Sequence, residues 1–334
     1  MQFGYSEACL DHDTGDRHPE TADRLRAIRQ QLARRHGVDY VAADPASVDA
    51  LTAVHDAEYV DDVRAFCENG GGNWDPDTVA SAETWTAART SAGLAQWAAE
   101  RALAGDDGRE TPFSIGRPPG HHAVADDAMG FCFFNNAAVA ARSVIDDGAA
   151  DRVAIFDWDV HHGNGTQDIL YDQGDVFYAS IHEEGLFPGT GEVDETGAED
   201  GTGTTLNVPL SAGAGDADYV LVFERVIGPA IERFDPDLFL VSAGFDAHRH
   251  DPISRMRVST EGYALLTERV RETADAVDAG LAFVLEGGYG LDTLSESIAT
   301  VHETFDGRAP VPVDEDPTDA TRDVLDAVRS AHDL

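Results

Sequence analysis

The chain carries a carboxylate and an imidazole at a spacing that could hold a metal ion. Asp159 and His161 lie within residues 157–167, directly after the apolar run 153–156. That run predicts a short buried strand, and side chains two positions apart on an extended chain share a face. Both groups can therefore point at one object from the carboxyl end of a strand, as metal ligands do. An alternative is that they only cap a helix beginning near Gly165.

Other apolar segments of the chain lead into groups of the same kind. They are 113–115 before His121 and His122, 238–241 before Asp246, and 282–285 before Tyr289. In sheets of parallel strands, ligands bind beyond the carboxyl ends of the strands. We therefore expect these groups to converge on one rim together with Asp159 and His161.

Such a rim could perform metal-assisted hydrolysis. Asp159, His161 and Asp246 would leave positions open for water and a substrate oxygen, as catalytic metal sites require. A metal held in this way acidifies its water and polarises a carbonyl. Two carboxylates and one imidazole suit zinc, and ferrous iron would also fit.

The remaining groups could supply proton transfer and charge stabilisation. His121 or His122 could take the proton from the attacking water and return it to the leaving group. Tyr289, which stands between glycines, could donate its hydroxyl to a developing oxyanion. Taken singly, each has a simpler alternative, because paired histidines are often ordinary surface or core residues and a tyrosine after glycines often only packs.

The elements needed to position these groups alternate along the chain. This rhythm predicts an α/β fold with a mostly parallel sheet and helices on both faces. The expected strands are 113–116, 153–157, 176–181, 238–243 and 281–286, and the expected helices between them are 135–147, 164–172, 217–233, 259–278 and 290–305. No linker divides the chain, so we expect a single domain over residues 1–334.

The two ends of the chain have their own patterns. Before the alternation we expect helices over 19–36, from about 47, and over 78–103, with an irregular Gly- and Asn-rich loop at 69–77. After it, an acidic segment begins at Asp314, and a last helix is expected over 318–330 within the C-terminal stretch 314–332.

Composition limits the class of protein. The chain has 334 residues, of which 42% are hydrophobic, enough to bury a large core. Its three cysteines (Cys9, Cys67 and Cys132) have no CxxC spacing, so a reducing cytoplasm is the expected location. We see no signal peptide and no apolar stretch near the ~20 residues of a membrane span.

The charge balance is strongly acidic. Acidic residues number 63 against 23 basic ones, all of them Arg, and the net charge is −40. This excess opposes direct binding to nucleic acid or to anionic membranes. It is tolerable where molar salt screens surface repulsion, so we hypothesise a cytoplasmic protein of a salt-accumulating halophile. Full folding and activity in dilute buffer, with no gain from molar salt, would contradict this hypothesis.

Several of these segments resemble motifs of the histone deacetylase superfamily, which also includes acetoin-utilisation proteins and acetylpolyamine amidohydrolases. The similar segments are 18–20, 117–123, 130–136, 157–167, 242–246 and 285–289. The resemblance extends over roughly residues 5–305. Asn164 stands where class I members have Asp, so the chain resembles class II. The implied fold is the arginase-like α/β sandwich around an eight-stranded parallel sheet.

The resemblance also implies roles for the residues at the rim. Asp159, His161 and Asp246 match the zinc ligands, and Tyr289 matches the tyrosine that stabilises the transition state. His121 and His122 match a histidine dyad. The expected partners of the dyad are Asp157 for the first histidine and Asn164 for the second.

Two further sites follow from the resemblance alone. Gly130, Phe131 and Phe187 match the walls of an acyl-lysine tunnel. A structural potassium site is implied at Asp157, the backbone oxygens of Asp159 and His161, and the hydroxyl of Ser180. A second monovalent-cation site is usual in the family near the helix that follows Gly165.

The substrate is the least determined property. We favour acetyl-lysine in proteins or peptides. A small acetylated amine such as an acetylpolyamine is the alternative, although Ile253 stands where one polyamine-selective group has Glu; Asp75 and Asp77 could supply acidic groups instead. A binuclear manganese ureohydrolase would need more ligands than the three identified. A catalytically silent acetyl-lysine binding module is a further alternative, while the oligomeric state is not readable from the sequence.

Overall fold

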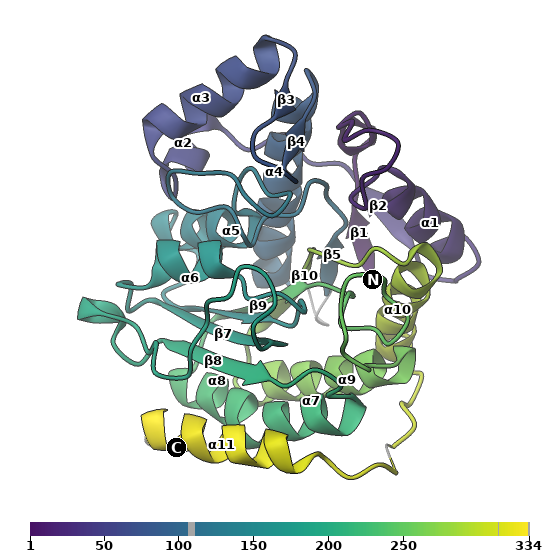
Figure 1. The fold of residues 1–334 in the computed structure, drawn as a ribbon, viewed down its shortest axis with the longest axis vertical. Helices are drawn as coiled ribbons and strands as arrows, with labels where there is room; N and C mark the ends of the chain where they lie inside the picture. Colours follow the sequence, from purple (N-terminus) through teal and green to yellow (C-terminus); the bar gives the residue numbers. More distant parts are fainter. Residues whose placement is uncertain (106–110, 313, 333–334) are drawn as a thin grey trace.

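A parallel eight-stranded sheet lies at the centre of the molecule (Figure 1). The computed structural model describes residues 1–105, 111–312 and 314–332, so the predicted domain over 1–334 includes a few positions outside the described residues. The strand order is β2-β1-β5-β10-β9-β6-β7-β8. The strands are β1 (Gln2–Gly4), β2 (Asp39–Val41), β5 (Pro112–Ser114), β6 (Val153–Asp157), β7 (Val176–Glu183), β8 (Thr205–Leu210), β9 (Leu238–Ala243) and β10 (Gly280–Leu285). The predicted α/β class is confirmed.

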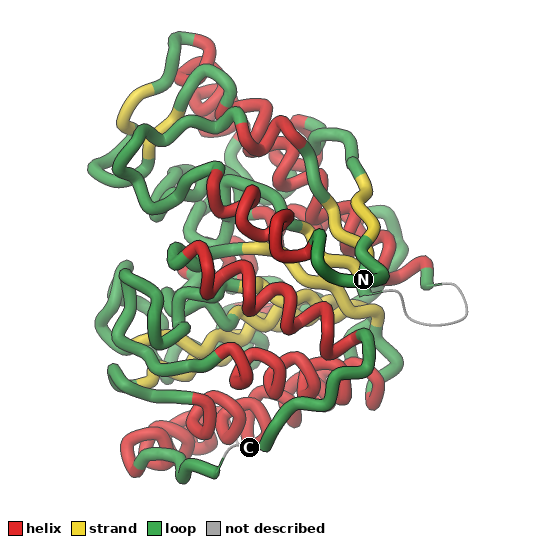
Figure 2. Tube along the Cα trace, turned by 90° about the vertical axis from the view of Figure 1, so that its right-hand side faces the viewer, coloured by secondary structure: helices red, strands yellow, loops and turns green. Residues whose placement is uncertain are grey.

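Helices cover both faces of the sheet, and Figure 2 shows the strands as a layer between them. Along β6, Ala154 and Phe156 belong to one apolar core, whereas Val153 and Ile155 belong to a second core on the opposite face. The strand is apolar at all four positions because it is buried on both faces.

The first core is covered by helices from both ends of the chain, and the second by helices from its first half and middle. Those on the first core are α1 (Asp23–Leu32), α7 (Asp216–Val222), the π-helical turn η3 (Phe223–Ile227), α8 (Gly228–Phe234), α9 (Thr260–Ala276), α10 (Leu291–Phe305) and α11 (Asp319–His332). Those on the second are α2 (Val48–Thr52), α3 (Ala57–Glu68), α4 (Thr84–Ala104), α5 (Asn136–Asp146) and α6 (Asn164–Leu170). Short 3-10 turns, η1 (Glu7–Leu10) and η2 (Glu199–Gly201), complete the helical elements.

Two of the helices predicted in the N-terminal part of the chain begin later in the structure, at Asp23 and at Thr84. Thr78 does not start a helix, because its backbone N–H and hydroxyl both donate to the carboxylate of Asp75. The segment instead forms β4 (Val79–Ala80), which pairs with β3 (Gly72–Asn73) in the loop predicted to be irregular. The helix expected over 19–36 spans only α1, since Glu20 is held in a buried ion pair before the helix begins.

Of the strands of this sheet missing from the prediction, β2 and β8 are the two edge strands, and β1 lies next to β2. β1 and β2 have three residues each, too few to show a pattern. β8 contains Pro209, which is tolerated in an edge strand. The predicted C-terminal helix is present as α11, and it packs near β8 with Thr321, Leu325 and Val328 buried. No helix in the described part of the chain combines the length and the apolar character needed to cross a bilayer.

The strand order brings the chemically active segments together. β5, β10, β9 and β6 are consecutive neighbours in the sheet, and all of them run in the same direction. Their carboxyl ends therefore meet along one rim, where the residues that follow each strand can face a common space.

Candidate metal centre and active site

Asp159, His161 and Asp246 form a buried cluster at this rim. Their potential ligand atoms all lie within 4.8 Å of one another. His161 Nδ1 is 3.0 Å from Asp159 Oδ1 and 3.3 Å from Asp246 Oδ2. Asp159 and His161 follow β6, whereas Asp246 follows β9. The structure thus brings together the three residues that were predicted as metal ligands.

These three residues fit a small divalent cation. Ligand atoms at zinc–ligand distances of about 2.0–2.1 Å in a tetrahedron are separated by roughly 3.3 Å. Asp246 Oδ2 is buried and accepts no hydrogen bond from the described residues, which is unusual for a carboxylate oxygen. The other oxygens are held by backbone N–H groups, since Asp159 Oδ2 accepts from Gly287 and Asp246 Oδ1 from Val160.

Electrostatics at the cluster also favour a cation. Burial lowers the pKa of His161, but the neighbouring carboxylates of Asp159 and Asp246 outweigh burial and raise it to about 10. Burial raises the pKa of Asp246, and the neighbouring charge of Asp159 raises it further. Two buried carboxylates this close repel each other, and a positive charge between them would relieve that repulsion.

The two histidines of the dyad stand side by side next to the cluster. Their ring centres are 4.0 Å apart, and the ring of His122 is 5.7 Å from that of His161. His121 Nδ1 lies 3.0 Å from Asp157 Oδ2, and His122 Nδ1 lies 2.8 Å from Asn164 Oδ1. An amide oxygen only accepts, so His122 donates through Nδ1 and, when neutral, its Nε2 is free to accept a proton.

The partners give the two histidines opposite charge states. Burial lowers the pKa of His121, but Asp159 and Asp157 outweigh burial and raise it to about 10. Burial together with the charges of His121 and His161 holds the pKa of His122 well below its usual value. At neutral pH the pair therefore combines a charged His121 with a neutral His122.

Tyr289 follows β10 and packs against Phe131 and Arg24. Its ring packs edge-on against Phe131 at 5.7 Å, and the guanidinium of Arg24 lies 5.0 Å from the ring centre. Burial raises the pKa of Tyr289 well above 10, so its hydroxyl is protonated at neutral pH and can donate a hydrogen bond.

The predicted tunnel residues flank the reacting groups. Phe187 packs edge-on against His122 at 5.0 Å and remains 40% exposed, so it reaches from the site to the surface. Gly130 has φ = 55°, and a Cβ there would lie 2.4 Å from the ring of His122. Only glycine fits this close approach. Phe187 therefore contacts the dyad, and Phe131 contacts Tyr289.

Asp157, predicted to bind both His121 and potassium, lies behind the metal cluster. Its Oδ1 accepts from the backbone N–H of Asp159 at 3.0 Å, and its Oδ2 faces His121 and the hydroxyl of Tyr178. Ser180 is its register partner on β7. The side chains expected at the potassium site are thus neighbours, although the Ser180 hydroxyl lies 3.0 Å from His182 Nδ1.

Glycines form the floor of the site. A Cβ at Gly244 would lie 2.0 Å from Asp159 Oδ2, one at Gly287 2.2 Å from Asp246 Oδ2, and one at Gly163 2.3 Å from Asp157 Oδ2. Real side chains essentially never approach so closely, so the backbone itself packs against the carboxylates.

A set of buried charges supports the site and was not assigned a role from the sequence. Arg117 donates to both carboxylate oxygens of Glu20 at 2.7 Å, and Arg24 bridges Glu20 to the backbone oxygens of Glu286 and Gly288. The Glu286 carboxylate accepts from the N–H groups of Gly120 and His121 at 2.7 and 3.1 Å. These contacts tie the start of the dyad segment to the tyrosine loop.

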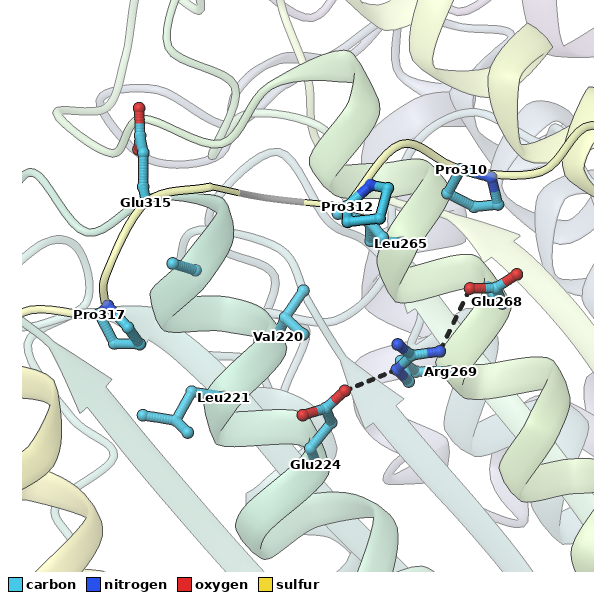
Figure 3. A pocket seen from close by; sticks show the side chains of 11 residues that line it. Val220, Leu221, Glu224, Leu265, Glu268, Arg269, Pro310, Pro312, Glu315 and Pro317 are labelled. Carbon is cyan, nitrogen blue, oxygen red and sulfur yellow. Dashed lines mark hydrogen bonds and ion pairs between the residues drawn. The ribbon is translucent and has the colours of Figure 1, made fainter.

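A separate groove lies away from this rim. It has a volume of about 280 Å³ and runs between α7 and α9 under a proline-rich segment (Figure 3). Glu224 and Glu268 are both paired with Arg269 there. Among the described residues, the Asp159–His161–Asp246 cluster is the group of side chains found to suit a metal ion.

Comparison with known proteins agrees with this geometry. Residues 18–305 match the family model described as "Histone deacetylase domain". The chain is 38% identical to "Histone deacetylase 10, chloroplastic" of Oryza sativa subsp. japonica, over 95% of this chain and 78% of that protein. It is 41% identical to "Histone deacetylase-like amidohydrolase" of Pseudomonas aeruginosa, over 81% of this chain and 71% of that protein.

An archaeal protein and a solved structure are similar as well. A "Probable deacetylase" of Methanothermobacter thermautotrophicus is 39% identical, over 87% of this chain and 86% of that protein. The crystal structure of the HDA15 HD domain superposes with a TM-score of 0.91 and 38% identity, covering 99% of this chain and 93% of that one.

Proposed function

Because the chain belongs to the histone deacetylase family, we propose that it removes acetyl groups from acetyl-lysine in proteins or peptides. The observation that carries the proposal is the convergence of the Asp159–His161–Asp246 cluster, a dyad with one charged and one neutral histidine, and a protonated tyrosine on one rim.

The chain's own residues divide the chemistry of hydrolysis. Asp159, His161 and Asp246 would hold zinc, or ferrous iron, which would polarise the acetyl carbonyl and acidify a water. The neutral His122 accepts the water's proton at Nε2 and later passes it to the departing amine. The charged His121 stabilises the negative charge that develops beside it. Tyr289 donates its hydroxyl hydrogen to the former carbonyl oxygen.

The rim supports a lysine side chain more than a polyamine. Both oxygens of the Asp75 carboxylate accept hydrogen bonds from within its own loop, from the N–H groups of Asp77 and Thr78 and from the Thr78 hydroxyl. These contacts hold Asp75 within its own loop, and Ile253 offers no charge. Asp77 is exposed and lines a pocket beside Phe131, so it is the acidic group that supports the small-amine alternative. An aliphatic stem can lie between Phe131 and Phe187, where it buries apolar surface.

Activity on defined substrates tests this proposal. We expect turnover of a fluorogenic acetyl-lysine peptide, its loss with a chelator, and its return with added zinc or ferrous ion. An acetylpolyamine measured in parallel should be the poorer substrate by kcat/KM. Peptide binding without turnover would instead favour a silent binding module, and preference for the polyamine would favour the small-amine alternative.

We also propose a potassium ion beside Asp157, with Ser180 and the backbone oxygens of Asp159 and His161 as its ligands. The register of β6 and β7 supports this position, since it pairs Asp157 with Ser180. A cation there would stabilise a carboxylate whose pKa is raised by burial.

A salt-rich cytoplasm is the proposed setting. Its support is the net charge of −40 and the absence of Lys from the sequence. Mutual repulsion on such a surface weakens when salt shortens the screening length. Circular dichroism from dilute to molar potassium chloride tests it, and a folded fraction independent of salt would argue against this setting.

A further inference from the structure

Asp251 lies where the loop after β9, which carries Asp246, meets the tyrosine loop, the segment after β10 that carries Tyr289. It follows the ligand Asp246 by five residues and is 7% exposed. Its Oδ2 accepts from the backbone N–H groups of Tyr289 at 2.7 Å and Gly290 at 3.0 Å, and its Oδ1 accepts from Ile253 at 3.1 Å. We propose that Asp251 is a positioning residue that sets the place of the Tyr289 hydroxyl; this rests on the proposed deacetylase function.

The tyrosine loop needs such a partner because of its local structure. It is irregular, with Gly288 at φ = 112°, and it leads into α10 with Gly290 as the N-cap. The N–H groups at a helix start have no partner within the helix. One carboxylate oxygen accepts from the N-cap residue Gly290 and from Tyr289 just before it, and its negative charge is favourable at the N-terminus of a 15-residue helix.

Two sets of contacts hold Tyr289, one at its ring and one at the backbone of its loop. Phe131 and Arg24 contact the ring and limit its tilt. Arg24 also donates to the backbone oxygen of Gly288, whereas Asp251 accepts from the backbone N–H of Tyr289 itself. The hydroxyl position therefore depends on both sets of contacts together.

Asp251 also couples the tyrosine to the metal side. The hydroxyl of Ser254, three residues later, donates to the backbone oxygen of Asp246. Asp251 thereby belongs to a short closed loop that joins a metal ligand, the rim residue Ile253 and the oxyanion donor. A shift of this loop would move Tyr289 relative to the reacting carbonyl.

Asp251→Asn is the direct test, because all three contacts of this side chain are acceptors. An asparagine must turn its NH₂ group toward at least one backbone N–H, which loosens the loop while side-chain volume is kept. A displacement of about 1 Å can cost ~10²-fold in rate. We expect kcat to fall roughly 10- to 100-fold with KM nearly unchanged.

A double-mutant cycle separates positioning from general damage. In the Tyr289→Phe background there is no hydroxyl left to position, so adding Asp251→Asn should change kcat less than about threefold. If the two losses multiply in full, Asp251 does not act through Tyr289 and the proposal is overturned.

Asp237→Asn is a matched control at the opposite end of β9. One Asp237 oxygen also accepts from two successive backbone N–H groups, those of Asp151 and Arg152, at 2.8 and 2.9 Å. It is more exposed and lies away from the rim, so kcat should stay near the wild-type value. An equal loss in both variants would mean that any such carboxylate matters, and would overturn the specific role.

A readout without turnover distinguishes failure of this inference from failure of the proposed function. In a crystal structure of Asp251→Asn we expect Tyr289 displaced or in alternate positions, while Asp159 and His161 stay in place. An unmoved, fully ordered Tyr289 overturns the inference even if the enzyme is active. Absence of wild-type deacetylase activity would reject the proposed function alone. Should the Asn variant not fold, Asp251→Ser, which keeps one acceptor oxygen, is measured in the same way.

Discussion

Two groups of buried carboxylates meet at the rim, and they differ in what they face. The metal cluster, comprising Asp159 and Asp246 with His161, directs carboxylate oxygens into a shared gap, where one of them has no hydrogen-bond donor. The supporting carboxylates, Glu20 and Glu286, are equally buried but face arginines and backbone N–H groups. Burial alone therefore does not identify a reactive carboxylate. A buried carboxylate oxygen that lacks a hydrogen-bond donor does.

The same difference appears in their electrostatics. Burial raises the pKa of Glu20, but Arg117, His12 and Arg24 outweigh burial and lower it to about 2. Glu20 is thus charged and neutralised by the protein itself. In the metal cluster, burial and the neighbouring charge of Asp159 raise the pKa of Asp246, and a bound cation would relieve that repulsion.

Substitutions in the metal cluster should have the largest effect. Asp159→Ala or Asp246→Ala should remove most bound metal and nearly all turnover, because two remaining ligands hold a metal poorly. Elemental analysis of the purified variants, alongside turnover of an acetyl-lysine peptide, measures both. A variant with full metal content and a near-normal rate would remove that residue from the cluster.

Glu20→Gln should act on stability rather than on chemistry. Removing one partner of a buried ion pair typically costs about 3–5 kcal/mol, here by leaving Arg24 and Arg117 without their carboxylate. Urea unfolding at pH 7 in constant salt measures the loss. Glu7→Gln is the control, since Glu7 pairs with Arg29 at the surface and should cost under about 1 kcal/mol. Equal losses would erase the distinction between the two regions.

The effect of Glu20 has a defined pH dependence. Its pKa is near 2 in the folded protein against a usual value of 4.5. A depressed pKa stabilises the fold above the unfolded pKa, and the contribution disappears as pH falls through the folded one. The stability gap between wild type and Glu20→Gln should therefore narrow between about pH 4.5 and pH 2. A gap that widens with acid would contradict the ion pair.

Tyr289 belongs to neither group and should show an intermediate loss. Tyr289→Phe removes one donor to a developing oxyanion, which typically costs ~10²–10³ in kcat, or about 2.7–4 kcal/mol. Metal content, KM and unfolding should change little. A loss confined to KM would reassign Tyr289 from transition-state stabilisation to substrate positioning.

The smallest effect is expected at Asp157, which touches both regions. If potassium binds there, rates at fixed molar ionic strength should differ between potassium, lithium and caesium chlorides, by about fivefold, the low end of typical coupling. Circular dichroism of the same samples excludes unfolding as the cause. Identical rates in the three salts would leave only surface screening.

Sequence reasoning succeeded where neighbours along the chain carry the information. Asp159 and His161 are two residues apart on the end of a strand, so their shared direction is readable without a fold. Asp246, His121 and Tyr289 follow apolar strands whose carboxyl ends were expected to meet at one rim. The structure brings all of these residues to one rim.

The supporting contacts could not be read in the same way. Arg24 donates to the backbone oxygen of Gly288, 264 positions away, and no local pattern encodes such a pair. Glu286 ends an apolar strand and looks like a polar residue at a strand terminus. Thr78 was assigned to a helix because alanines follow it, whereas a side-chain contact with Asp75 decided its conformation. Tertiary partners, which are absent from periodicity, determined each of these cases.

The glycine floor has an evolutionary consequence. At Gly163, Gly244 and Gly287 any added carbon would collide with a reactive carboxylate, so almost every amino-acid change there is closed to selection. The partly exposed residues around the site, such as Phe187 and Ile253, have no such constraint. Relatives that adopt new substrates should therefore differ at these exposed residues, while the residues of the reaction and the glycines packed against them stay the same.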